Sequence, residues 1–133
     1  MSAQRCSVTR THDKVRTVGA HYLSNVDAES WEPFDLGDGR IVGEVHWLRS
    51  DESEGAELYA GVWRVASPEP PPPFRYEMAL DETIHVLEGE LHLQLEGGPM
   101  LVLAEGDIAS FESGTSTVWT LVRTPFKEVF VLS

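Results

Sequence analysis

The chain has 133 residues, a length that suits one domain with a buried core. It carries 10 Lys and Arg residues against 22 Asp and Glu residues, which gives a formal net charge of −12 at pH 7. We therefore expect neither nucleic acid nor an anionic membrane surface as a partner, because both are bound by clustered Lys and Arg.

The chain begins with a polar segment, residues 1–18, which holds four basic side chains against one acidic side chain. This composition predicts a flexible or loosely docked arm that pairs with the acidic remainder of the protein, residues 19–133. An arm that binds a separate partner is the alternative. The sequence has neither a signal-peptide core nor an apolar run long enough to span a membrane, so we expect a cytoplasmic protein.

Residues 24–40 are rich in Gly, Asn, Asp and Ser and predict turns, with Trp31 and Phe34 as buried aromatic side chains. Two strands follow, at residues 41–48 and 57–66, and we expect them to form a hairpin. Alternation in the first strand places Glu44, His46 and Leu48 on one face and Val45 and Trp47 on the other.

A proline-rich connector, residues 67–73, leads to a series of short apolar runs. The runs at residues 82–88 and 90–95 predict a hairpin with its turn at Gly89 and Glu90. We predict further strands at residues 100–103, 108–111, 117–122 and 126–132. Many short strands separated by Gly or Pro, with no helical periodicity, indicate an all-β sandwich or barrel.

Two stretches of the second half resemble the motifs of the cupin superfamily. Glu82 and Gly89 have the spacing of the first cupin motif, and Gly106 to Gly114 is similar to the second. The resemblance covers residues 57–133 and implies a single cupin barrel, a double-stranded β-helix or jelly roll, with N-terminal extension strands. It also implies a homodimer, for which residues 126–132 would offer an apolar edge strand. Residues 60–63, Trp119 and residues 127–130 resemble the cupins like (S)-ureidoglycine aminohydrolase.

A typical cupin holds Fe, Mn, Zn or Ni with three His and one Glu. Here the resemblance places Glu82 at the Glu position, but Thr117 at one His position. The other two His positions hold Arg75 and Glu77, or Tyr76 and Met78 if the shorter gap applies. The usual tetrad is therefore absent, and we expect no cofactor. The alternative is a rebuilt divalent metal site that contains Glu82, His46 and Glu77.

The remaining chemistry centres on the carboxylates. Alternation places Glu82, Ile84 and Val86 on one face, which by resemblance looks into the barrel. We expect Glu77 and His46 to join Glu82 there, and a pair of buried carboxyl groups can act as general acid and base. The predicted substrate-binding residues are Arg75, Tyr76, Trp63, Thr117, Trp119 and Phe130.

These residues predict a small-molecule enzyme that isomerises, cyclises, dehydrates or hydrolyses a small polar metabolite. Two alternatives remain open, namely a ligand-binding cupin module without turnover and a metal-dependent cupin.

Overall fold

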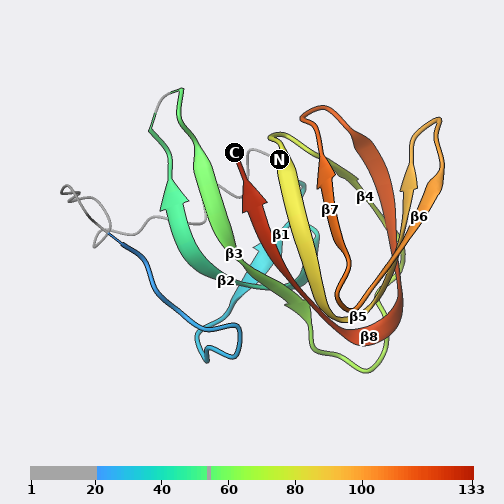
Figure 1. The fold of residues 1–133 in the computed structure, drawn as a ribbon. Helices are drawn as coiled ribbons and strands as arrows, with labels where there is room; N and C mark the ends of the chain where they lie inside the picture. The colour runs from blue at the N-terminus through green and yellow to red at the C-terminus, as the bar shows by residue number, and fades with distance from the viewer. Residues whose placement is uncertain (1–20, 54) are drawn as a thin grey trace.

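The computed structural model describes residues 21–53 and 55–133, and within these ranges it contains eight strands and no helix. The strands are β1 (Glu32–Asp35), β2 (Ile41–Asp51), β3 (Leu58–Val65), β4 (Phe74–Glu77), β5 (Glu82–Leu95), β6 (Met100–Ala104), β7 (Ile108–Phe111) and β8 (Ser116–Leu132). All pairings are antiparallel, and the sheet curves around an enclosed core (Figure 1). The predicted all-β jelly-roll class is confirmed, whereas the predicted arm, residues 1–18, lies outside the described residues.

Two long strands, β5 and β8, form the centre of the sheet. They pair along their whole length, from Glu82 opposite Leu132 to Leu95 opposite Thr117. Both turn sharply at the bottom of the view in Figure 1 and so contribute to both sides of the curved sheet. The sequence predicted a hairpin within β5 and two separate strands within β8, and both predictions are wrong.

Gly89 explains why β5 bends without ending. Its φ of +90° lies in the left-handed region, and the pairing with β8 shifts register on either side of it. A Cβ atom at this position would lie 2.7 Å from the carbonyl oxygens of both Arg123 and Pro125. The bend therefore needs glycine both for its backbone angle and for the close approach of β8.

The other strands extend this centre on both sides. The strand order is β1-β2-β3-β8-β5-β6, with β4 also paired to β8 and β7 to β5. The predicted hairpin of β2 and β3 is confirmed. The short strand β1 was predicted as turn, and its residues acquire strand geometry by pairing with β2. Because β8 lies between β3 and β5, residues 126–132 are no edge strand, and that basis for a dimer is wrong.

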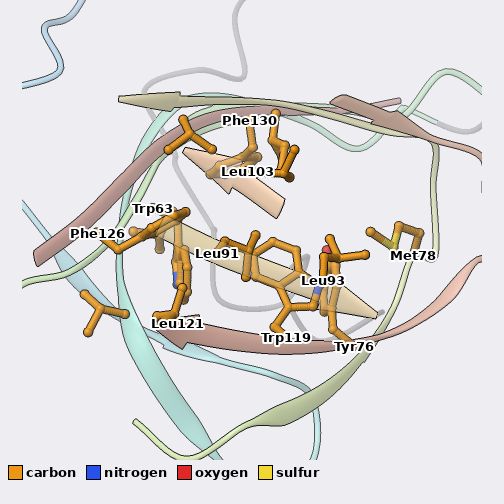
Figure 2. Close-up of a cluster of buried hydrophobic side chains, with 14 of the residues drawn as sticks. Trp63, Tyr76, Met78, Leu91, Leu93, Leu103, Trp119, Leu121, Phe126 and Phe130 are labelled. Atoms are coloured by element: carbon orange, nitrogen blue, oxygen red, sulfur yellow. The ribbon is translucent and has the colours of Figure 1, made fainter. Parts of the chain in front are cut away.

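Aromatic side chains fill the space inside the curved sheet. Figure 2 shows Trp63, Trp119 and Phe126 within a cluster of buried side chains that come from strands distant in the sequence. The ring of Trp63 contacts the edges of Trp119 and Phe126, with centroid distances of 5.8 Å in both pairs. Such edge-to-face contacts add about 0.5–1.5 kcal/mol per pair to the burial of apolar area. This packing fixes the walls of an apolar pocket among the described residues.

Candidate functional site

The pocket lies on the inner side of the sheet and combines an aromatic wall with two carboxyl groups. Its lining residues are Phe34, Leu36, Trp47, Trp63, Phe74, Tyr76, Glu82, Trp119, Glu128, Phe130 and Leu132. The volume that the centre of a water-sized sphere can reach is about 30 Å³. This corresponds to roughly two or three water molecules, so the pocket as it stands fits a very small ligand.

Glu82 opens β5 and points into the pocket, with 3% of its surface exposed. The Tyr76 hydroxyl, from β4, donates a hydrogen bond of 2.5 Å to Glu82 Oε1. Burial raises the pKa of Glu82 to about 7, and the hydrogen bond from Tyr76 acts in the opposite direction. Near neutral pH, Glu82 is therefore present in both its protonated and its ionised form.

Glu128 lies on β8, opposite Val86 of β5 and Trp63 of β3, and only 2% of its surface is exposed. Its Oε1 atom has no hydrogen-bond partner among the described residues. Burial, and after it the negative charge of Glu82, raise the pKa of Glu128 well above its ordinary value. The pocket thus holds two carboxyl groups in unequal surroundings.

Glu128 was missed as a site residue by sequence reasoning, although a signal for it was present. It alternates with Phe126, Phe130 and Leu132, and all three apolar side chains are buried. Side chains two residues apart in a strand share a face, so this pattern places Glu128 inside. Residues 126–132 were predicted to form a strand, but Glu128 was not assigned to its inward face.

The structure brings four of the predicted binding residues to the pocket wall, Trp63, Tyr76, Trp119 and Phe130. Thr117 is buried next to them and acts within the wall: its hydroxyl donates to the Tyr76 carbonyl oxygen at 2.6 Å and accepts from Trp119 Nε1 at 2.9 Å. Thr117 therefore holds two pocket residues in place. The roles of these residues in substrate binding remain predictions.

Glu77 and Arg75 lie outside the pocket, so their predicted place in the cavity is wrong. Both side chains are exposed, since they alternate along β4 with the buried Phe74 and Tyr76. The Ser116 hydroxyl donates to Glu77 Oε1 at 3.4 Å, and an Arg75 nitrogen lies 3.8 Å from a carboxylate oxygen of Glu96. Once Tyr76 points inward, its neighbours must point outward.

His46 also lies on the outer face of the sheet, which corrects the expectation that it joins Glu82. Its Nε2 is 2.6 Å from Ser24 Oγ, and its Nδ1 is 2.8 Å from the Ser30 carbonyl oxygen. The neighbouring Val45 and Trp47 are buried. The two faces of β2 were separated correctly from the sequence, but the wrong face was assigned to the interior.

The donor atoms of the pocket do not fit the metal site that the cupin resemblance implies. Such a site uses three imidazoles and one carboxylate, whereas the pocket offers Glu82, Glu128 and the hydroxyl of Tyr76. Within residues 21–53 and 55–133, no three His, Cys, Asp or Glu side chains are grouped so that they could hold a metal ion. The side chains of His85 and His92, both on β5, also point away from the interior of the curved sheet.

Comparisons with known proteins agree with this fold. Residues 52–130 match the model of the EutQ-like cupin domain, Cupin_3. A putative ethanolamine utilization protein Q from Salmonella typhimurium LT2 is 25% identical over 77% of this chain and 76% of that chain, with a TM-score of 0.57.

Two more distant structures share the fold alone. KdgF from Halomonas sp. is 15% identical over 85% of this chain and 91% of that chain, with a TM-score of 0.58. Fe(II)-HppE with the alternative substrate (S)-1-HPP is 18% identical over 88% of this chain and 62% of that chain, with a TM-score of 0.62. None of the curated proteins compared with the chain matches it. Among the described residues, no helix is long and apolar enough to cross a membrane.

Proposed function

Because the chain belongs to the family of EutQ-like cupin domains, we propose that it is a small-molecule enzyme in which Glu82 and Glu128 transfer protons on a compact polar metabolite. The observation that carries the proposal is the presence of two buried carboxyl groups in one pocket. Groups of one chemical type in unequal surroundings can take opposite roles in acid–base catalysis.

The surroundings of the two carboxyl groups support different roles for them. Glu82 accepts a hydrogen bond from Tyr76, which stabilises its ionised form, so Glu82 is the general base. Glu128 has an unpartnered oxygen and a pKa that is raised further by the charge of Glu82, so it keeps its proton and is the general acid. A base with a pKa of about 7 is well matched to neutral pH.

A dehydration illustrates the chemistry that this pair supports. Glu82 accepts a proton from a carbon atom of the substrate, and the electron pair of that C–H bond forms the new C=C bond. Glu128 donates its proton to the neighbouring hydroxyl group, which leaves as water. In an isomerisation the same pair removes a proton from one carbon atom and returns a proton to another. Both reactions use only the two carboxyl groups and the substrate.

Hydrogen–deuterium exchange tests the proposal without knowledge of the final product. Small alcohols, hydroxy acids, amines and amides would be incubated with the protein in D₂O and examined by NMR for deuterium at carbon. The resemblance to the (S)-ureidoglycine aminohydrolase group makes nitrogen-bearing compounds the first members of the panel. We expect exchange with the wild type and with Glu77→Gln, the exposed control, and a loss of at least a hundredfold with Glu82→Gln.

A ligand-binding module without turnover is the second candidate. It is favoured by the short hydrogen bond from Tyr76, which occupies one oxygen of the assigned base. In that case compounds of the panel would bind without exchanging deuterium, and Glu82→Gln would change stability while it left binding intact. A cytoplasmic homodimer remains our expectation for either candidate, and light scattering on the purified chain would measure its mass.

A further inference from the structure

The pocket contains a buried hydrogen-bond acceptor, Glu128 Oε1, that lacks a donor among the described residues. The indole N–H groups of Trp47, Trp63 and Trp119 all donate to atoms that are not pocket carboxylates. Their acceptors, in the same order, are Glu32 Oε1, Val42 O and Thr117 Oγ1. Among the described residues, the Tyr76 hydroxyl is the one side-chain donor recorded on a pocket carboxylate, and it serves Glu82. The buried Oε1 of Glu128 is therefore available to accept a hydrogen bond from a ligand.

Within residues 21–53 and 55–133, no positively charged side chain lines the pocket. Each Lys or Arg within the described ranges is paired with an acidic side chain. The pairs are Arg40–Asp38, Arg49–Asp51, Arg64–Glu44, Arg75–Glu96, Arg123–Glu90 and Lys127–Asp27. Two buried carboxyl groups without a cation are costly when ionised, and a positively charged ligand would offset that cost.

We propose that the pocket selects a small organic cation, a primary ammonium group on a short carbon chain, which donates to Glu128 and Glu82 and lies against the aromatic wall. This inference rests on the proposed function only for the location of the ligand and requires no turnover. An ammonium group supplies the missing donors and the missing charge together. Indole and phenyl rings attract cations, and the short carbon chain would contact the same rings.

The size and chemistry of the lining separate this ligand from a metal ion. Hard divalent cations take six or more oxygen ligands, whereas the described lining offers two carboxyl groups and one phenol among aromatic and aliphatic side chains. A volume of about 30 Å³ suits a molecule of about three non-hydrogen atoms. Ethylammonium has this size, and ethanol and formate are its neutral and anionic counterparts.

Binding of such a cation is coupled to protons. The titratable side chains that face the pocket are Tyr76 from β4, Glu82 from β5 and Glu128 from β8, while β1, β2 and β3 contribute only apolar or indole side chains. A cation beside the carboxyl groups favours their ionised forms. Ethylammonium should therefore bind more tightly at pH 8 than at pH 6 and should release protons as it binds.

Isothermal titration calorimetry on the whole chain tests the proposal. Ethylammonium chloride, ethanol, sodium formate and magnesium chloride would be titrated at equal ionic strength, in two buffers with different ionisation enthalpies. We expect ethylammonium to bind at least tenfold more tightly than the other three and to release protons. Glu128→Gln should weaken the binding of ethylammonium at least tenfold, while Glu77→Gln should leave its affinity unchanged. Circular dichroism would confirm that both variants are folded.

Three results would overturn the inference: equal binding of ethanol and ethylammonium, unchanged affinity in folded Glu128→Gln, or tighter binding of magnesium. The experiments distinguish a failure of this cation preference from a failure of the proposed enzymatic function. Deuterium exchange that depends on Glu82, in neutral compounds only, would refute the cation preference and keep the enzyme. Ethylammonium binding through Glu128, with no exchange in any compound, would refute the enzyme and keep the cation preference.

Discussion

The buried carboxyl group of Glu82 should make the stability of the protein depend on pH, and Glu82→Gln should reduce that dependence to the part that Glu128 contributes. The folded protein raises the pKa of Glu82 from 4.5 to about 7, so the folded state holds its proton more tightly than the unfolded state does. The resulting stability is fully present below pH 4.5 and is lost as the pH rises through 7. The wild type should therefore become less stable between pH 5 and pH 8.5.

The size of this loss follows from the two pKa values. A shift from 4.5 to about 7 corresponds to a loss of roughly 2.5 kcal/mol in the free energy of unfolding between pH 5 and pH 8.5. The side chain is almost completely buried, so solvent does not screen this effect. Glu128 adds a loss of the same sign, since its pKa is also raised.

Urea unfolding at half-unit pH intervals would measure the loss, with the fluorescence of the buried Trp47, Trp63 and Trp119 as the signal. Glu82→Gln should decrease the slope between pH 5 and pH 8.5, and Glu82→Gln combined with Glu128→Gln should flatten it further. The exposed Glu77→Gln should keep the wild-type slope. If Glu82→Gln has the same slope as the wild type, the carboxyl group titrates normally and the acid–base assignment is refuted.

Three further changes test the neighbouring contacts. Tyr76→Phe removes the donor to Glu82, so it should destabilise the protein by about 1–3 kcal/mol at pH 8 and move the pH-dependent loss to higher pH, both measured by urea unfolding. Glu128→Gln should be more stable than the wild type at pH 8 in the same assay, and lower stability would show that the carboxylate has a partner. Gly89→Ala should lower the free energy of unfolding by more than about 2 kcal/mol. Gly97 also has a positive φ, +70°, but open space around it, so Gly97→Ala should lower it by only about 1 kcal/mol. Equal losses of stability in thermal unfolding would exclude the clash of the methyl group added at Gly89 with β8.

The fold class was accessible from the sequence because strand alternation and Gly or Pro punctuation are local signals. The hairpin of β2 and β3 was predicted from two successive strand-like runs, and alternation placed Glu82, Ile84 and Val86 on one face of β5, which the cupin resemblance assigned to the interior. The bend at Gly89 was not predicted, because a glycine between two apolar runs fits either a turn or a bend. The choice is made by contacts with Arg123 and Pro125, which are remote in the sequence.

Local sequence signals also predicted a part of the site. Glu82 was found, since its motif and its alternation with Ile84 agree. His46 was misplaced because alternation separates two faces without saying which is inside, and the large Trp47 was the better guide to the interior. The alternation of Glu128 with Phe126 and Phe130 places it inside, but its position in the same pocket as Glu82 follows only from the pairing of β8 with both β3 and β5.

The single strand β8 limits how this pocket can change during evolution. It contributes Trp119, Glu128, Phe130 and Leu132 to the lining. Odd-numbered residues of β8 face inward up to Leu121, and even-numbered residues face inward from Phe126 onward. A codon inserted just before residue 126 would reverse that parity, bringing Lys127 and Val129 inside and turning Glu128 to the solvent. Gene variants that keep the carboxyl pair should therefore differ in β8 by substitution or by paired insertions, and differences in length should be confined to the turns.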